Sequence, residues 1–234
     1  MGSSYSKMEK NKIILLTGAS GGIGFEILKS ISKKNKVVAI YNKNKPKLNN
    51  KNVKLIKLDL ENQISLNHKF LENKKIIFIN LAAIKIDNLL VNTKVETWEK
   101  IFQINVHSFF SILQIVLPYM IKKKWGRIIS FSSTDGEIGD IGTSAYSASK
   151  YSLIGMNKVI SKEYGKFGIT CNMIVLGNFN YGMYKKLSQK KRNKLLEKVP
   201  NKKTGNITNI INAINYIINS EYVNGSRMKI DGGI

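Results

Sequence analysis

The sequence is short of cysteine and histidine, which excludes several kinds of site. The single Cys171 cannot form an internal disulfide and fits a protein of a reducing compartment. Together with only two histidines, His68 and His107, it offers too few ligands for a Cys/His metal centre. The apolar runs of the expected strands are far shorter than the roughly 20 residues of a transmembrane helix, and none has the layout of a secretory signal. We therefore expect a cytoplasmic protein with no metal site and no membrane segment.

Arginine is also scarce, although the chain is strongly basic. The formal net charge is +23, yet only Arg127, Arg192 and Arg227 among the 38 basic residues are arginines. Proteins that bind nucleic acid usually rely on Arg, whose planar guanidinium makes paired contacts to bases and phosphates. Lysines scattered among Asn and Ile are typical of genome bias and a solvated surface, so we expect no nucleic-acid partner. A basic surface that docks an acidic partner remains the alternative.

What the sequence does contain is an alternation of short apolar runs and longer amphipathic ones. Its 234 residues are enough for one α/β domain, and no repeat or linker divides them. Residues 1–10 are polar and are expected to form a flexible extension ahead of a domain at 11–234. Strands are expected at residues 12–17, 36–41, 54–59, 75–80, 126–132, 170–175 and 226–230. Helical patterns cover residues 23–33, 64–71, 95–122, 146–167 and 207–219. The alternation predicts a doubly wound α/β domain with a seven-stranded, mostly parallel sheet.

A glycine-rich turn directly follows the first expected strand. The segment "TGASGGIG", residues 17–24, places Gly18, Gly22 and Gly24 ahead of the first helical pattern. Glycine lets the backbone turn sharply and approach a pyrophosphate, and the N-terminus of the following helix attracts the phosphates. A strand before the turn and a helix after it predict a nucleotide site here.

Further motifs follow in the order of one family, and with this glycine spacing the chain resembles the short-chain dehydrogenases/reductases. "LDL" at residues 58–60 matches the family's adenine-binding acid, "NLAA" at 80–83 its Asn-Asn-Ala-Gly motif, and "DGG" at 231–233 its C-terminal ending. The resemblance covers nearly the whole chain and implies a Rossmann-type fold that binds NAD(P). The cofactor-binding residues that it implies are Gly18, Ser20, Gly21, Gly22, Ile23, Gly24, Tyr41, Asn42, Lys43, Asp59, Leu60, Asn80, Ala82, Ala83, Tyr146, Lys150 and Gly177.

The residues after the second expected strand favour NADP(H). An acid there would bind the ribose 2′-hydroxyl of NAD, whereas a cation favours the 2′-phosphate of NADP. The segment "AIYNKNKPK", residues 39–47, has Tyr41, Asn42, Lys43 and Lys45 but no acid. Because Gly21 stands where many NADP-dependent relatives have Arg or Lys, NAD(H) remains the alternative.

Four residues match the active-site residues of the family in order and separation: Asn105, Ser133, Tyr146 and Lys150. Tyr146 and Lys150 lie four positions apart in "SAYSASK", so the ammonium is expected to lower the pKa of the phenol. By the resemblance, Tyr146 gives a proton to the carbonyl oxygen of the substrate, and Ser133, rather than Ser132, polarises the carbonyl. Asn105, in a distorted helix, is expected to bind a water that links Lys150 to solvent.

Residues 177–206 are expected to form a lid over the substrate. The expected substrate contacts are Ser133, Tyr146, Asn178, Tyr181 and Met183. The length of the lid, Met183 and a helical pattern at residues 187–200 resemble 3-oxoacyl-(acyl-carrier-protein) reductases, which reduce a ketone to a secondary alcohol. An acidic carrier protein would then dock on basic residues. These are the lid lysines with Lys124, Arg127 and Lys166.

Departures from the family pattern and its diversity leave alternatives. Leu176 in place of Pro, Tyr181 in place of Thr and Ala83 in place of Gly predict a changed cofactor affinity. An alternative enzyme acts on a sugar or another polar metabolite, for example in surface-glycan biosynthesis. The non-enzyme alternative is a Rossmann-type nucleic-acid-binding or regulatory protein. The family commonly forms dimers or tetramers, and apolar faces on the helices at 95–122 and 146–167 suit a homotetramer or homodimer.

Overall fold

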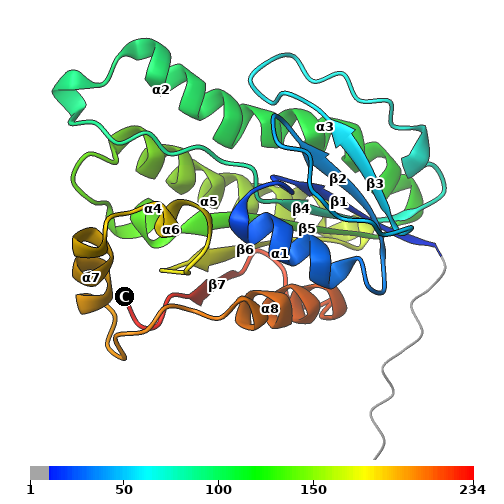
Figure 1. The fold of residues 1–234 in the computed structure, drawn as a ribbon. Helices are drawn as coiled ribbons and strands as arrows, with labels where there is room; N and C mark the ends of the chain where they lie inside the picture. Colours follow the sequence, from blue (N-terminus) through cyan, green and yellow to red (C-terminus); the bar gives the residue numbers. More distant parts are fainter. Residues whose placement is uncertain (1–10) are drawn as a thin grey trace, which may run out of the picture.

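The computed structural model describes residues 11–234, so the extension expected at residues 1–10 lies outside the described residues. Seven strands form one sheet in the order β3-β2-β1-β4-β5-β6-β7, and every neighbouring pair is parallel (Figure 1). The strands are β1 (Lys12–Thr17), β2 (Lys36–Tyr41), β3 (Val53–Lys57), β4 (Lys75–Asn80), β5 (Gly126–Ser133), β6 (Ile169–Leu176) and β7 (Arg227–Ile230). The doubly wound α/β fold is confirmed, and its sheet is parallel throughout.

The central strands are apolar along most of their length because helices cover both faces of the sheet. β6 is buried at every position, whereas the edge strands β3 and β7 have only partly buried and exposed positions. β1 and β4 run side by side from the Lys12–Lys75 pair to the Thr17–Asn80 pair. The chain leaves β1 for β2 on one side and β4 for β5 on the other. In such sheets, ligands bind beyond the carboxyl ends of the strands at this point.

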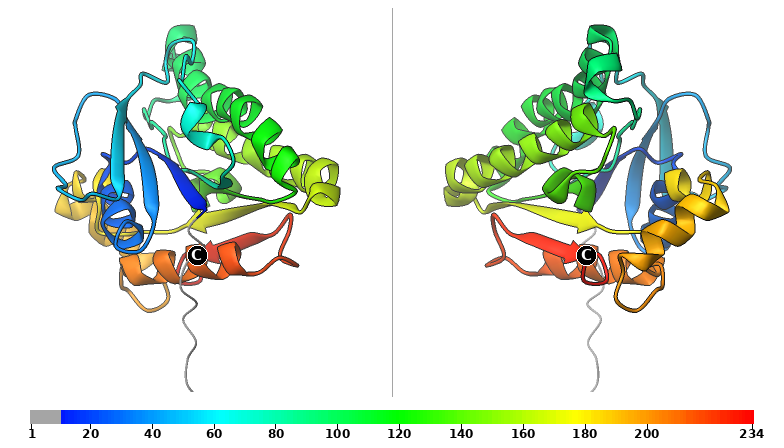
Figure 2. Two further views of the ribbon diagram at one scale, coloured as in Figure 1. Left: turned by 90° about the vertical axis from the view of Figure 1, so that its right-hand side faces the viewer. Right: turned by 90° about the vertical axis from the view of Figure 1, so that its left-hand side faces the viewer.

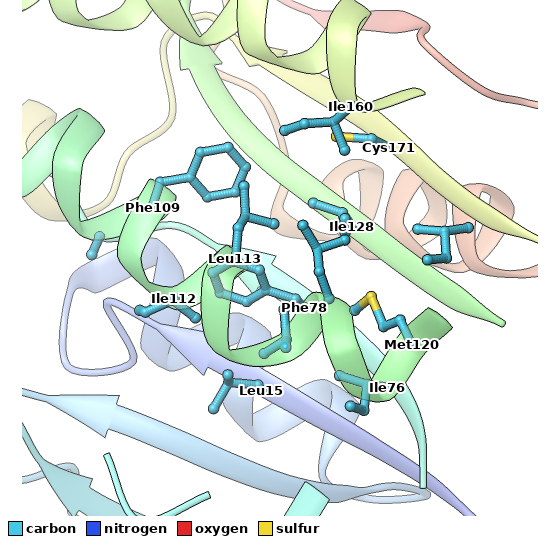
Figure 3. Close-up of a cluster of buried hydrophobic side chains, with 14 of the residues drawn as sticks. Leu15, Ile76, Phe78, Phe109, Ile112, Leu113, Met120, Ile128, Ile160 and Cys171 are labelled. Atoms are coloured by element: carbon cyan, nitrogen blue, oxygen red, sulfur yellow. The ribbon is translucent and has the colours of Figure 1, made fainter. Parts of the chain in front are cut away.

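Helices cover the sheet in two layers (Figure 2). Helices α1 (Gly22–Ile31) and α8 (Ile207–Asn219) pack together on one face. Helices α3 (Ser108–Lys123) and α5 (Ser144–Tyr164) cover the other face, and α2 (Val95–Phe102) packs against α5. In this second layer, the rings of Phe78 on β4 and Phe109 on α3 stack 5.7 Å apart (Figure 3). The two apolar cores fix the strand ends from which the site is built.

The helix expected at residues 95–122 is interrupted by a π-helical turn at Gln103–His107. Among the described residues, the stretch Val95–Lys123 is the one helix long and apolar enough to cross a membrane by length and composition. In this fold α3 buries its apolar face against the sheet, as the core helix of a globular domain does. Asn105 lies at the centre of the π-helical turn, and such turns are frequent at functional sites.

The helix expected at residues 64–71 is wrong, since only a 3₁₀ turn at Lys69–Leu71 forms there. The side-chain oxygen of Asn67 accepts a hydrogen bond from the Lys69 N–H, and such bonds compete with helix formation. The short helix α4 (Thr134–Ile138) has no counterpart among the expected helices. Strand bounds differ from expectation by no more than one or two residues. Further 3₁₀ turns lie at Leu90–Asn92 and Gly165–Phe167.

The segment at residues 177–206, the expected lid, leaves the sheet after β6 and returns before α8. It carries two helices, α6 (Gly182–Lys185) and α7 (Gln189–Glu197), and α7 confirms the helical pattern expected at residues 187–200. The two ends of the lid are joined by a bridge between Phe179 and Gly205.

Candidate functional site

A cavity of about 390 Å³ lies at the carboxyl edge of the sheet and is the candidate site. One part of its wall is formed by Tyr41 at the end of β2, Asn42 just after it, and Asp59 after β3. Another part is formed by Ser133 and Tyr146. Its volume lies in the range of small-molecule and cofactor pockets. A site that spans the switch between β1 and β4 suits a dinucleotide, whose two halves bind on either side of it.

The turn between β1 and α1 has the shape of a phosphate cradle. Gly18 has a φ of 70°, and a Cβ on it would lie 2.8 Å from the Ala82 backbone nitrogen. A Cβ on Gly24 would lie 2.1 Å from the Gly18 carbonyl oxygen. Helix α1 begins at Gly22 with no side-chain cap, so its first N–H groups are available to an anion. The residues present therefore fit the pyrophosphate of a dinucleotide.

The lid packs onto this turn. A Cβ on Gly22 would lie 2.2 Å from the Gly182 backbone nitrogen, so α6 rests directly on the start of α1. Gly182 and Tyr184 both line the cavity, although neither is among the expected site residues. No sequence motif includes these two residues, so only their position within the expected lid could have predicted that they line the cavity.

The expected substrate residues of the lid reach the same cavity. Asn178, Tyr181 and Met183 all line it. Gly177 lines it too, and a Cβ on Gly177 would lie 2.6 Å from the Cα of Asp231 in the "DGG" motif. The C-terminal motif therefore supports the base of the lid by close backbone packing.

Ser133, Tyr146 and Lys150 converge at the end of β5. Ser133 is the last residue of β5 and the N-cap of α4, and its hydroxyl accepts a hydrogen bond of 3.2 Å from the Asp135 N–H. Tyr146 and Lys150 lie one turn apart on α5, and both are buried. The Ser133 side chain also lies close enough to the Tyr146 phenol to lower its pKa. Ser132 instead donates to the Lys150 carbonyl at 3.4 Å. Two hydroxyls beside one another can bind a single carbonyl oxygen of a substrate.

Burial dominates the acidity of Tyr146. It raises the pKa of the phenol, Asp135 and Asp87 raise that pKa further through their charge, and the neighbouring Ser133 side chain lowers it. The net shift is upward, which is opposite to the lowering expected from the sequence. The reason is that a phenolate in this site would lose water and face two carboxylates.

The Lys150 ammonium is anchored by a backbone carbonyl. It donates to the Phe131 carbonyl at 2.8 Å and lies 5.9 Å from the centre of the Tyr146 ring. Burial lowers the pKa of Lys150 to about 8. The ammonium is therefore charged at neutral pH but easily deprotonated in mild alkali.

Asn105 does not line the cavity, but its side chain forms hydrogen bonds with the segments that do. Its side-chain oxygen accepts from the Ile84 N–H at 2.8 Å, and its amide donates to the Ile84 carbonyl and to the Ser149 hydroxyl at 3.0 Å each. These bonds tie the π-helical turn to the segment after β4 and to the residue before Lys150. Asn105 is a positioning residue by its side chain, and its expected contact with a water stays a prediction.

An ion pair beside Tyr146 was not among the expected features. The Lys85 ammonium lies 2.7 Å from a carboxylate oxygen of Asp135, 3.7 Å from one of Asp87 and 5.4 Å from the centre of the Tyr146 ring. Lys85 follows the "NLAA" motif and Asp135 lies two residues after Ser133. A cation is thus placed between the two carboxylates that act on the phenol.

Two expected cofactor residues lie outside the cavity wall, whereas all the other expected cofactor residues line it. Lys43 is exposed just beyond it. Asn80 is 2% exposed, and its side-chain oxygen accepts from the Thr17 hydroxyl at 2.7 Å. Asn80 thus joins the carboxyl ends of β1 and β4, on which the site is built.

At the other end of the cavity, Asp59 is held in place by its neighbours. It accepts a hydrogen bond of 2.9 Å from the Asn42 amide and one of 3.1 Å from the Glu61 N–H. The bond between Asn42 and Asp59 ties the segment after β2 to the segment after β3. Asp59 is therefore oriented before any ligand binds.

Comparison with known proteins agrees with this geometry. The family model for short chain dehydrogenases matches residues 12–192. The 3-oxoacyl-(acyl-carrier-protein) reductase FabG of Buchnera aphidicola subsp. Baizongia pistaciae is 35% identical, over 95% of this chain and 97% of its own length. The FabG reductase of Salmonella typhimurium is 32% identical, over 96% of this chain and 98% of its own length.

A solved structure assigned to a betaketoacyl-ACP reductase has the same fold. It matches with a TM-score of 0.80 over 96% of this chain and 98% of that chain, at 20% sequence identity. The family model and the two relatives go further than fold, because they match by sequence over most of the chain. The chain therefore belongs to the short chain dehydrogenase family, the NAD(P)-dependent oxidoreductases that act on alcohol and carbonyl groups.

Proposed function

We propose that the protein reduces the keto group of a 3-oxoacyl thioester, carried on an acyl carrier protein, to a secondary alcohol with NADPH. The observation that carries the proposal is the convergence of Ser133, Tyr146 and Lys150 in a cavity that also has a phosphate cradle. The substrate class is supported by the FabG relatives, which align with this chain over nearly its full length.

The hydroxyls of Ser133 and Tyr146 provide the acid chemistry of the reduction. When bound, the nicotinamide supplies a hydride to the carbonyl carbon. Tyr146 gives its proton to the carbonyl oxygen, and Ser133 donates a hydrogen bond to that oxygen as negative charge builds on it. Ser133 is suited to donate because its oxygen already accepts from the Asp135 N–H.

The charge of Lys150 makes the proton transfer from Tyr146 feasible. A buried phenol is a weak acid, and the charges of Asp135 and Asp87 weaken it further. The Lys150 ammonium, on the same face of α5, stabilises the phenolate that forms. Asn105 helps by fixing Ser149, the neighbour of Lys150, through a hydrogen bond of 3.0 Å.

We propose NADPH rather than NADH as the cofactor. Tyr41 and Asn42 line the cavity where β2 ends, and the Asp59 carboxylate already accepts two hydrogen bonds from the protein. The next basic residues, Lys43 and Lys45, are exposed and supply the positive charge that a 2′-phosphate favours.

The acidic carrier protein is proposed to dock on exposed lysines. Lys124 and Lys166 are exposed, as are most lysines of the lid. Arg127, which the sequence placed in this surface, is only 5% exposed, and its guanidinium donates to three backbone carbonyls. It stabilises the fold and is not available for docking.

We propose a cytoplasmic homodimer or homotetramer. Large apolar side chains are exposed on the outer faces of two helices: Phe110 on α3 is 51% exposed, and Tyr151 and Val159 on α5 are 60% and 51% exposed. Faces of this kind suit a symmetric pairing of helices. Light scattering on the purified protein tests the assembly.

The function is tested by NADPH oxidation with acetoacetyl thioesters and with keto-sugars as substrates. We expect turnover of the thioester, and a loss of about a thousandfold or more in kcat for Tyr146→Phe with NADPH binding retained. Turnover of a keto-sugar without turnover of any 3-oxoacyl thioester would refute the substrate class. Full activity of Tyr146→Phe would refute the mechanism.

A further inference from the structure

A second cavity, of about 460 Å³, lies within the lid. It is distinct from the cavity that Ser133 and Tyr146 line, which we call the reaction cavity. We call the second cavity the lid pocket, and its wall includes Tyr184, Gln189, Arg192, Lys202, Lys203 and Thr204. Tyr184 also lines the reaction cavity, so the two cavities share a wall. A group bound in the lid pocket would therefore lie beside the reacting substrate.

The lid pocket is positively charged. Arg192, Lys202 and Lys203 line it, and no acidic residue does. The Lys202 ammonium donates to the Glu197 backbone carbonyl at 2.5 Å, which fixes its position without neutralising it. Among the described residues, the Arg192 Nε atom is buried and has no hydrogen-bond partner. A buried guanidinium nitrogen without a partner is costly, and the uncompensated charge of Arg192 favours an anion in the pocket that this residue lines.

Arg192 differs from the two other arginines of this lysine-rich chain. Arg127 donates to three backbone carbonyls, and Arg227 forms an ion pair of 3.0 Å with Glu137. Both are thus bound by groups of the protein itself. Arg192 has no such side-chain bond among the described residues, yet it lines a pocket together with two lysines. The planar guanidinium of Arg can donate two parallel hydrogen bonds and is therefore the side chain best suited to bind a phosphate group.

Two structural elements bring these charges together. Gln189, Arg192 and Leu196 lie at helical spacing on one face of α7 and line the pocket, whereas the lysines between them do not. Lys202 faces them from a tight turn in which it has a φ of 54°, a conformation uncommon for Lys. The Asn201 side chain accepts from the Lys203 N–H at 3.0 Å and holds the next residue of the turn.

We propose that the lid pocket binds a phosphate ester of the substrate, at a point remote from the keto group. Resting on the proposed function, we assign this group to the phosphate of the pantetheine arm through which a carrier protein holds its acyl chain. Arg192 and Lys203 contact the phosphate oxygens, and the bound phosphate holds the lid against the glycine-rich turn. Substrate binding and lid closure are thereby coupled.

The test uses pairs of ligands that differ only in the phosphate. Reduction of acetoacetyl-phosphopantetheine is compared with that of acetoacetyl-pantetheine, in the full-length protein and in Arg192→Gln and Lys203→Gln. Lys51→Gln is the control, because Lys51 is exposed, lies outside the lid and lines neither cavity. We expect the ratio of kcat/KM for the two thioesters to fall about tenfold in Arg192→Gln, through KM, and to stay unchanged in Lys51→Gln. An unchanged ratio in Arg192→Gln would overturn the proposal.

Calorimetry with ligands that carry no acyl group separates this proposal from the proposed function. We expect phosphopantetheine to bind the wild-type protein more tightly than pantetheine does, and this advantage to disappear in Arg192→Gln. If no thioester is reduced but this pattern holds, the proposed function fails and the phosphate site stands. If thioesters are reduced and the phosphate confers no advantage, the site fails and the function stands.

Two further ligands identify the source of the phosphate. Binding of inorganic phosphate as tightly as phosphopantetheine would mean an adventitious ion only and would refute a substrate site. Binding of a sugar nucleotide through Arg192, without binding of phosphopantetheine, would overturn the assignment to a carrier arm.

Discussion

Lys85 and Asp135 form an ion pair of 2.7 Å at the edge of the reaction site, although 50 residues separate them in the chain. The ammonium also lies 5.4 Å from the centre of the Tyr146 ring, and the Asp135 carboxylate is one of the charges that raise the pKa of Tyr146. From this position we expect Lys85 to offset the effect of Asp135 on the proton donor. The ion pair balances charge beside Tyr146, and neither of its residues belongs to the set of Ser133, Tyr146 and Lys150.

Replacement of Lys85 should weaken Tyr146 as an acid. In Lys85→Met the carboxylates of Asp135 and Asp87 lose their partner, so the pKa of the phenol rises further. We expect kcat for reduction to fall about tenfold, since one pKa unit corresponds to a tenfold change in proton-transfer equilibrium. The measurement is kcat at saturating NADPH between pH 6 and 8.

A double variant separates this effect from general damage. Lys85→Met with Asp135→Asn removes both charges and should recover most of the lost kcat. Lys29→Met breaks a comparable ion pair of 2.8 Å with Glu26 on α1, away from the site, and should leave kcat unchanged. Equal losses in the single and double variants would show that Lys85 acts by packing and not by charge.

The low pKa of Lys150 predicts opposite trends for activity and stability in mild alkali. Burial lowers this pKa to about 8, so the free enzyme loses the ammonium above pH 8. We expect kcat/KM for NADPH to fall as the pH rises through about 8, because the phenolate then lacks its stabilising charge. Kinetics between pH 6.5 and 9.5 measure this, and a flat profile over that range would contradict it.

The same shift should make the fold more stable between pH 8 and 9. In this window the unfolded chain still holds the Lys150 proton whereas the folded chain has released it, so the free energy of unfolding rises with pH. Denaturant unfolding at both pH values measures the rise. The increase should be absent in Lys150→Met, and an equal increase in that variant would assign it to another group.

The fold was predictable because its signals are local. Buried parallel strands are continuous apolar runs, and the glycine-rich turn between β1 and α1 marks where a nucleotide fits. Ser133, Tyr146 and Lys150 lie within 18 residues and on two neighbouring elements, so their order in the sequence nearly fixes their convergence.

What could not be predicted depends on contacts between distant segments. No periodicity brings Lys85 to Asp135, and none distinguishes Arg192 from the lysines around it. The pKa of Tyr146 was expected to fall because Lys150 lies one turn away on the same helix, whereas burial and the carboxylates of Asp135 and Asp87 raise it. Asn80 resembles a cofactor residue by its motif, yet its hydrogen bond with Thr17 makes it a support of the sheet.

Loss of the Asn105 side chain should impair both stability and turnover. Asn105→Ala removes three hydrogen bonds of 2.8 to 3.0 Å to Ile84 and Ser149 and leaves buried polar groups without partners. We expect the free energy of unfolding to fall by about 2 to 4 kcal/mol and kcat to fall more than KM changes. Denaturant unfolding and steady-state kinetics measure these two effects.

Asn157 on α5 provides a control for this substitution. It is 1% exposed, and within the described part of the chain neither its side-chain oxygen nor its amide nitrogen has a hydrogen-bond partner. Asn157→Ala deletes the same atoms without breaking a hydrogen bond, so it should cost less stability and leave kcat intact. A greater loss for Asn157→Ala than for Asn105→Ala would contradict the positioning role of Asn105.

A carboxylate at the end of β2 should reverse the proposed cofactor preference. Tyr41 lines the cavity there, so Tyr41→Asp places a negative charge where the 2′-phosphate of NADPH is proposed to bind. We expect kcat/KM for NADPH to fall about a hundredfold, because like charges repel in a partly buried site, while kcat/KM for NADH rises or stays unchanged.

Two lysine variants provide the comparison. Lys43→Gln should lower kcat/KM for NADPH about threefold without an effect on kcat/KM for NADH, and Lys51→Gln, at an exposed position, should change neither value. Equal losses of kcat/KM with both cofactors in Tyr41→Asp would show that Tyr41 shapes the pocket but does not lie near the 2′-phosphate. A wild-type preference for NADH would refute the choice of NADPH.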